Sequence, residues 1–156
     1  MSLKTFSTLL FTILIFGLLG AQEQPGTAVI HIDHKQVEAA FEKGASILAT
    51  NNFKIQAGRR TGPGEVEIHD IDTDIFHVLE GSATFVTGGR AVETRSVGPG
   101  ETRAKEITGG DERQLVKGDV IVIPKGVPHW FKEVNGLLLY YVVKVSDAGE
   151  AKKNYK

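Results

Sequence analysis

From about residue 47 onward, the sequence alternates short apolar runs with clusters of Gly, Pro, Asn and Asp. This pattern is typical of short β-strands joined by tight turns, and no helical period interrupts it. We expect eight strands, at Phe53–Ala57, Val66–His69, Ile75–Leu79, Ala83–Thr87, Thr102–Ile107, Val120–Ile123, His129–Lys132 and Leu137–Val145. Regular spacing of short strands predicts an all-β sandwich or barrel rather than alternating strands and helices.

For two of these strands and one glycine, the sequence also predicts burial, a position in the sheet or a turn. Val120–Ile123 is apolar throughout, which predicts a fully buried strand. Leu137–Val145 is apolar on both faces over most of its length, which predicts a central strand. Gly81 follows an expected strand, and we predict that it ends this strand in a tight turn.

One short helix is expected ahead of the strands. Asp33 is a typical N-cap residue, and Val37, Ala40 and Phe41 recur on one helical face. Gly44 is expected to end the helix, because glycine is the usual residue just past a helical C-terminus.

The amino terminus has the layout of a secretory signal peptide. Lys4 supplies a positive start, Leu9–Leu19 is largely apolar, and Gly20 and Ala21 give small residues before a polar stretch. The apolar run is shorter than the roughly 20 residues that span a bilayer. We therefore predict cleavage after Ala21, a periplasmic or secreted protein, and no stable membrane insertion afterwards. An uncleaved anchor is the alternative.

The expected organisation is one domain with flanking segments. We assign residues 1–21 to the signal peptide, 22–52 to an N-terminal segment with the short helix, 53–146 to the barrel, and 147–156 to a flexible tail. The 156-residue chain contains no cysteine, which excludes disulfides, thiolate metal sites and a cysteine nucleophile. Its formal net charge of −1 gives no reason to expect nucleic acid as a partner.

Two segments carry residues suited to metal chemistry. Glu67 and His69 lie two positions apart, so on a strand they share one face. Asp74 opens the next expected strand and would return close to His69 if the two strands form a hairpin. His129 stands between a proline and a tryptophan, after a Pro- and Gly-containing turn that restricts its backbone.

Taken together, these segments resemble the two conserved motifs of the cupin superfamily. Positions of the first motif are matched by Glu67, His69, Asp74 and Gly81, with Gly62 one residue closer than the family spacing. The second motif is matched by Gly118, Pro124, Gly126 and His129, with Glu133 where the family has Asn. The resemblance spans about residues 53–145 and implies a double-stranded β-helix, the cupin jelly-roll barrel.

The resemblance also implies a metal site. By position, its ligands would be Glu67, His69, Asp74 and His129, with Glu67 in place of a family histidine and Asp74 in place of a family glutamate. Two imidazoles and two carboxylates suit a divalent metal ion such as manganese, iron, nickel or zinc. Glu67 would be the fourth ligand or a catalytic general base. A different register would put His69 at the first histidine position and Ile71 at the second, and a degenerate site without metal is the further alternative.

Other polar residues have weaker claims. Strand alternation puts His77 on the face opposite Asp74, and His31 and His34 are expected at the surface. Arg59 and Arg60 precede a Gly-Pro-Gly turn; an arginine there would suit a carboxylate substrate, although a solvated pair is the simpler interpretation.

Two classes of function remain open from the sequence. The first is a metal-dependent enzyme of dioxygenase, decarboxylase or isomerase type that acts on a small organic molecule. The second is a non-catalytic module that binds a small ligand or a metal ion. The resemblance also implies a homodimer, because barrels of this superfamily commonly pack side by side.

Overall fold

The computed structural model describes residues 28–146, and a compact unit that begins at Ile32 contains its helix and strands. The predicted signal peptide (1–21) and tail (147–156) lie outside the described residues, so both stay predictions. Within the described part of the chain, no helix is long and apolar enough to cross a membrane.

The helix α1 (His34–Lys43) forms where the sequence predicts it. The Asp33 side chain accepts a hydrogen bond from the Gln36 backbone N–H at 3.1 Å, and the Gln36 side chain accepts one from the Asp33 backbone at 3.2 Å. This reciprocal capping box satisfies two N–H groups that the helix itself cannot pair. Gly44 ends the helix in the left-handed region at φ 65°, which confirms the predicted C-terminus.

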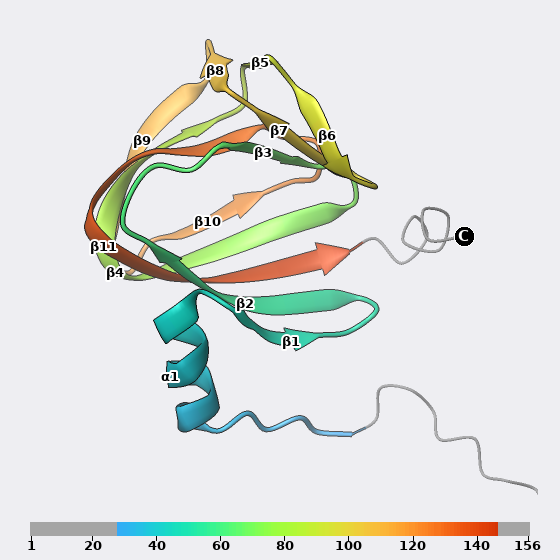
Figure 1. Ribbon diagram of the computed structural model, residues 1–156, viewed down its shortest axis with the longest axis vertical. Helices are drawn as coiled ribbons and strands as arrows, with labels where there is room; N and C mark the ends of the chain where they lie inside the picture. The colour runs from blue at the N-terminus through green and yellow to red at the C-terminus, as the bar shows by residue number, and fades with distance from the viewer. Residues whose placement is uncertain (1–27, 147–156) are drawn as a thin grey trace, which may run out of the picture. The chain divides into compact units, whose positions relative to one another are not determined.

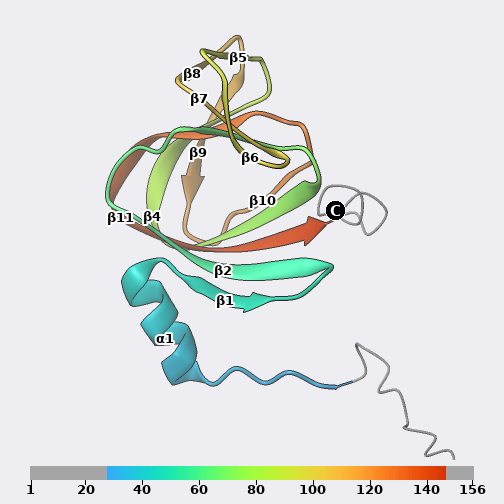
Figure 2. The same cartoon turned by 45° about the vertical axis from the view of Figure 1, so that its right-hand side comes forward.

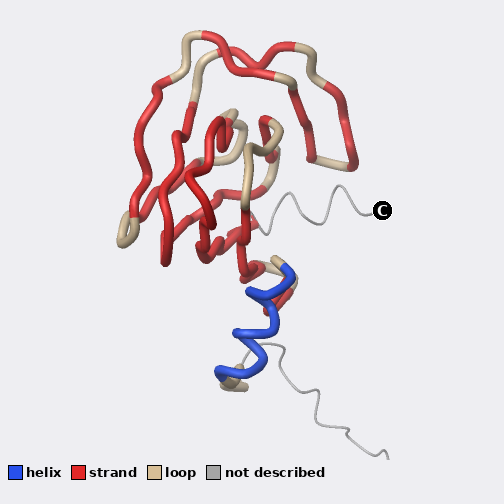
Figure 3. Tube along the Cα trace, turned by 60° about the vertical axis from the view of Figure 1, so that its left-hand side comes forward, coloured by secondary structure: helices blue, strands red, loops and turns tan. Residues whose placement is uncertain are grey.

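Strands account for most of the described chain (Figures 1–3). They are β1 (Ser46–Ala49), β2 (Phe53–Arg60), β3 (Val66–His69), β4 (Asp72–Thr87), β5 (Arg90–Val92), β6 (Arg95–Gly98), β7 (Glu101–Ala104), β8 (Glu106–Thr108), β9 (Asp111–Val116), β10 (Val120–Ile123) and β11 (His129–Ser146). All pairings are antiparallel.

The long strands β4 and β11 pair with each other and organise the rest of the sheet. One path of hydrogen-bonded neighbours runs β1-β2-β11-β3-β7-β6, while β4 also pairs with β9 and β10, and β5 and β8 form a separate ribbon. Figures 1 and 2 show the strands curving around a common interior, with α1 outside beside β2. This arrangement confirms the predicted all-β jelly roll, the double-stranded β-helix, with one short helix.

The prediction that Gly81 ends a strand in a tight turn is wrong. β4 continues through Gly81, which adopts φ 79° in an irregular stretch of its pairing with β11. A β-carbon at this position would lie 2.1 Å from the Leu137 carbonyl oxygen, so only glycine allows the two backbones to approach. The glycine therefore bends one long strand, and likewise β11 is one strand where two were expected.

The prediction that Val120–Ile123 is fully buried is also wrong. Val120 and Val122 are 62% and 55% exposed, whereas Ile123 is 2% exposed. Among the strands of residues 28–146, β10 pairs only with β4, so it lies at a sheet edge with one face toward the core. The central position predicted for Leu137–Val145 is confirmed, because this part of β11 pairs with β2 on one side and β4 on the other.

Aromatic rings dominate the core between these strands. Phe131 lies 4.6 Å from Phe85 and 5.7 Å from Phe76, measured between ring centroids. These residues belong to a buried cluster with Leu138 and Tyr140. The aromatic side chains thus pack beneath the polar site, because large apolar rings gain most from leaving water.

Candidate metal centre

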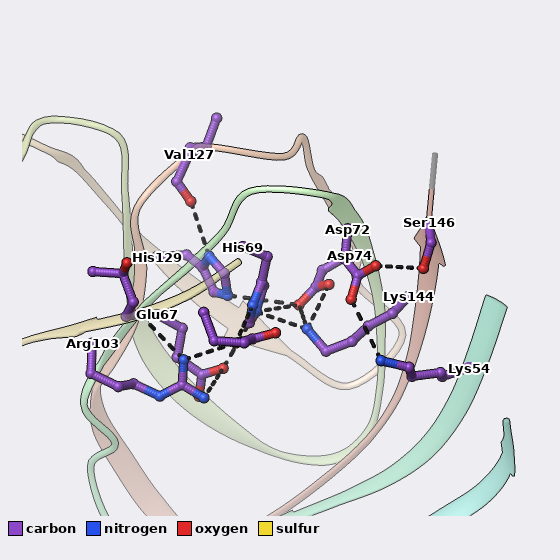
Figure 4. Close-up of polar contacts among 12 residues, drawn as sticks. Lys54, Glu67, His69, Asp72, Asp74, Arg103, Val127, His129, Lys144 and Ser146 are labelled. Carbon is purple, nitrogen blue, oxygen red and sulfur yellow. Dashed lines mark hydrogen bonds and ion pairs between the residues drawn. The ribbon is translucent and has the colours of Figure 1, made fainter. Parts of the chain in front are cut away.

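A pocket of about 530 Å³ opens into the interior of the jelly roll. Its deep wall is apolar and includes Phe76, Phe131 and Val142. Many of the other lining residues are charged, and β2, β3, β4, β7 and β11 all contribute charged residues. Figure 4 shows the polar side chains that converge in this pocket.

Three predicted site residues meet there because of strand geometry. Glu67 and His69 alternate onto one face of β3, and His129 begins β11 directly opposite Glu67. The Oε2 atom of Glu67 lies 3.5 Å from His69 Nε2, and the two imidazole centroids are 5.1 Å apart. The shared face predicted for Glu67 and His69 is therefore confirmed.

Asp74 reaches the same pocket by a route other than the expected hairpin. β3 pairs with β7 and β11 and not with β4, so the hairpin prediction is wrong. The predicted proximity is nevertheless confirmed, since Asp74 Oδ2 lies 3.3 Å from His69 Nε2 and 3.7 Å from His129 Nε2. The curvature of the sheet, rather than a local turn, brings His69 and Asp74 together.

His129 is oriented for coordination. Its Nδ1–H donates to the Val127 carbonyl oxygen at 3.1 Å, and the side chain is almost fully buried. Burial lowers the pKa of His129, so the ring is neutral at pH 7 and Nε2 carries the free lone pair. Among the described residues, this Nε2 is the buried side-chain atom that has no hydrogen-bond partner. A buried polar atom without a partner is costly, and a bound cation would satisfy it.

A carboxylate on the side of the ring away from Nε2 orients His69. Its Nδ1 donates to Glu101 Oε2 at 2.8 Å, which directs Nε2 into the pocket. Burial alone would lower the pKa of His69, but Asp74, Glu101 and Glu67 together raise it to about 10. The same three carboxylates would attract any cation at Nε2. Histidines that bind metals commonly have such a carboxylate on the second nitrogen.

Glu67 is ionised in this environment. Burial alone would raise its pKa, but the hydrogen bond with His69 and the charge of Arg103 lower it to about 2. Arg60 adds a contact, since its Nη2 donates to Glu67 Oε1 at 3.2 Å. The Glu67 carboxylate is therefore available as an anionic ligand throughout the physiological pH range.

The donor set fits a divalent metal ion. One ligand atom each from Glu67, His69 and His129 lies within 4.8 Å of the other two, as three ligands around one ion require. Two imidazole nitrogens and a carboxylate suit manganese, iron, nickel or zinc. Asp74, the fourth predicted ligand, lies beside this group but binds the Lys144 ammonium with both carboxylate oxygens, at 2.7 and 2.8 Å.

Sequence reasoning missed three residues of the site: Lys144, Glu101 and Arg103. Lys144 is the single charge in the apolar run of β11, two positions from the buried Val142, and that isolation was a usable signal. Glu101 and Arg103 face His69 and Glu67 across the β3–β7 pairing. The residues next to Glu101 and Arg103 in the sequence do not indicate that β7 pairs with β3 in this register.

Except for Arg60, which contacts Glu67, the remaining candidates lie away from the donor atoms. His77 is exposed on the outer face of β4, as alternation predicts, and His31 and His34 are exposed. Arg59 is exposed at the pocket rim. The Arg60 Nε donates to the Tyr140 hydroxyl at 3.0 Å, and its guanidinium lies over the Phe131 ring.

Comparisons with known proteins support the fold. The family model described as Cupin matches residues 23–154. A crystal structure from Bacillus halodurans has a TM-score of 0.54 and 15% identity, covering 81% of this chain and 85% of that one.

Two further solved structures have the same fold. The cupin domain of Cnp3 from Schizosaccharomyces pombe has a TM-score of 0.51 and 15% identity, covering 70% of this chain and 64% of that one. A Neisseria meningitidis protein has a TM-score of 0.50 and 16% identity, covering 75% of this chain and 100% of that one. No curated protein sequence matches this chain.

Proposed function

The chain belongs to the cupin family, and we propose that it binds a divalent metal ion through Glu67, His69 and His129 and uses it on a small organic molecule. The observation that carries this proposal is the buried, unpartnered Nε2 of His129, which faces the carboxylate and imidazole of the other two residues. A cation there would satisfy an atom that otherwise forfeits its hydrogen bond.

The pocket supports chemistry on a small molecule. Its volume of about 530 Å³ is in the range of small-ligand sites, and apolar residues such as Phe76 and Phe131 exclude water from its deep wall. A metal ion in this place would supply Lewis-acid polarisation of a bound oxygen group. Glu67 would serve as ligand or, if released, as general base, while Arg60 and Arg103 hold its carboxylate in place.

Export is part of the proposal. The signal peptide predicted for residues 1–21 would place the mature protein in the periplasm or outside the cell. N-terminal sequencing of the protein recovered from the extracytoplasmic fraction would test this directly. A mature chain that begins near Gln22 is expected, and a protein that remains in the cytoplasm with residue 1 intact would contradict it.

Metal analysis tests the site. The purified protein, His69→Ala, His129→Ala and His77→Ala would each be loaded with zinc, manganese, iron or nickel, desalted and analysed by inductively coupled plasma mass spectrometry. His77 is the matched control, because it is an exposed histidine of the same fold. We expect near-stoichiometric metal in wild type and His77→Ala and loss in the two site variants. A wild type that retains none of the four metals would refute the proposal.

The same samples separate the two classes of function. A loaded protein that turns over small carboxylic acids or carbonyl compounds is an enzyme. A loaded protein that binds such compounds without converting them is the non-catalytic module that the sequence also allows. The predicted homodimer stays a prediction.

A further inference from the structure

Lys144 occupies an unusual place for a lysine. It projects from β11 into the pocket, and its side chain is only 12% exposed. Its Nζ lies 2.7 and 2.8 Å from the two Asp74 oxygens and 2.8 Å from His69 Nε2 (Figure 4). An ammonium group between an imidazole nitrogen and a carboxylate makes the contacts that a metal ion would make with the same two side chains.

The ammonium and a metal ion compete for one atom. When the His69 ring is neutral, Nε2 has one lone pair, because Nδ1 then carries the proton donated to Glu101. That lone pair either accepts from Lys144 or binds the metal. The same conflict extends to Asp74, whose Oδ2 is close enough to both imidazole Nε2 atoms to join the ligand set but is held by the ammonium.

Electrostatic repulsion between the ammonium and a metal ion strengthens this competition. A lysine ammonium that stays on Asp74 would be a unit positive charge within a few ångströms of a divalent ion, in a pocket where water screens poorly. The surrounding carboxylates of Glu67, Asp74 and Glu101 attract either cation. The flexible four-carbon stem of lysine allows the ammonium to leave His69 without moving β11.

We propose that Lys144 is an internal competitor of the metal ion: it holds His69 and Asp74 in the metal-free protein and must leave His69 Nε2 before a divalent ion binds. Lys144 therefore weakens metal affinity and keeps Asp74 out of the ligand set until it moves. This inference rests on the proposed metal site and deepens it, since it makes the occupancy of the site depend on a residue outside the ligand group.

The test compares Lys144→Met, which removes the charge but keeps the length of the stem, with Lys132→Met. Lys132 is a matched control on the same strand, where its Nζ pairs with Glu112 at 2.7 Å on the outer surface. Dissociation constants for zinc, manganese and nickel would be measured by isothermal titration calorimetry. We expect Lys144→Met to bind at least tenfold more tightly than wild type and Lys132→Met to bind like wild type.

Three outcomes distinguish a failure of the Lys144 competition from a failure of the proposed metal site. If wild type binds metal and Lys144→Met binds equally or more weakly, the competition is refuted while the metal site stands. If wild type and Lys144→Met both fail to bind any of the three ions, the metal site is refuted and the inference falls with it. Binding by Lys144→Met alone supports the competition, but it refutes the proposal that the wild-type protein binds metal.

Stability gives a second readout, because Lys144→Met leaves the buried Asp74 carboxylate without its cation. We expect this variant to unfold at a lower temperature than wild type without metal, and added zinc to raise its unfolding temperature by more than it raises that of wild type. Zinc would supply the positive charge that Asp74 loses with Lys144. The proposal is overturned if zinc raises the unfolding temperature of Lys144→Met by no more than it raises that of wild type.

Discussion

At the scale of single residues, the roles of the two site histidines are set by the partners of their Nδ1 atoms. His129 donates to a backbone carbonyl and His69 donates to Glu101, so each presents Nε2 to the pocket. A carboxylate partner increases the basicity of the imidazole more than a carbonyl does, because it carries a full negative charge. His69 is therefore the histidine whose proposed bond to a metal ion depends most on a neighbour.

Removing this neighbour should weaken metal binding without removing a ligand. We predict that Glu101→Ala lowers metal affinity by about 10- to 100-fold, because His69 loses both its orientation and the charge behind it. Glu101→Gln keeps an acceptor for Nδ1–H and should lose less. The measurement is a competitive zinc titration with a chromophoric chelator.

The control for this prediction is Glu93→Ala, which removes an exposed carboxylate paired with Lys105 at 3.1 Å. Its metal affinity should equal that of wild type. Equal affinities for Glu101→Ala and Glu93→Ala would show that Glu101 does not support His69 as a ligand.

At the scale of the elements, sequence patterns located strands better than they located their ends and faces. The bounds of β3 and β10 match the prediction because turn residues flank each apolar run. β9 was missed, since Asp111–Val116 is polar except for Leu115 and Val116 and buries Leu115 alone. Burial of one side chain in six leaves no period for a sequence pattern to detect.

The backbone approach at Gly81 should be sensitive to a single methyl group. We predict that Gly81→Ala lowers the free energy of unfolding by about 3 kcal/mol or more, because the added β-carbon meets the Leu137 carbonyl and φ is positive. Gly136→Ala is the matched control: its φ is 70°, but no atom lies within 4 Å of the added carbon. The control should cost about 1–2 kcal/mol for the backbone strain alone.

Urea denaturation at equilibrium measures both losses. A Gly81→Ala variant no less stable than Gly136→Ala would show that β4 and β11 separate at this point at little cost. The comparison isolates the contact between backbones from the conformational preference of glycine.

The exposure of one face of β10 gives a further prediction. Val122→Ala should change the free energy of unfolding by no more than about 0.5 kcal/mol, because the side chain is mostly in water. Ile123→Ala should cost about 2–5 kcal/mol, since it opens a cavity in the core. Urea denaturation of the two variants measures both changes in the free energy of unfolding. Equal losses of free energy would mean that both faces of β10 are covered in solution.

At the scale of the whole molecule, the site depends on contacts that no local pattern contains. His69 meets Glu101 across 32 positions and Lys144 across 75 positions. The candidate ligands Glu67, His69 and His129 could be selected from the sequence, because motif spacing on β3 and around His129 marks them. Among the residues that surround those ligands, Lys144 alone is marked in the sequence, as the single charge in an apolar run. Glu101 and Arg103 were not predictable, because the register of β7 decides that they face the pocket.

Because two strands distant in sequence, β3 and β11, supply the proposed ligands, metal binding should stabilise the entire fold. An ion that binds only the native state stabilises it by about 2.7 kcal/mol at a concentration 100 times the dissociation constant. For a domain of this size we expect a rise in unfolding temperature on the order of 10 °C. Thermal melts over a zinc or manganese series measure it, and the rise should increase with the logarithm of metal concentration.

His129→Ala and His77→Ala decide whether such a rise comes from the pocket. His129→Ala removes the ligand that β11 contributes, so its unfolding temperature should not respond to metal, whereas His77→Ala should respond like wild type. A wild-type response that persists in His129→Ala would place the stabilising ion elsewhere. Loss of the response in His129→Ala alone would instead mean that one ion, bound across β3 and β11, holds the two strands together in the folded protein.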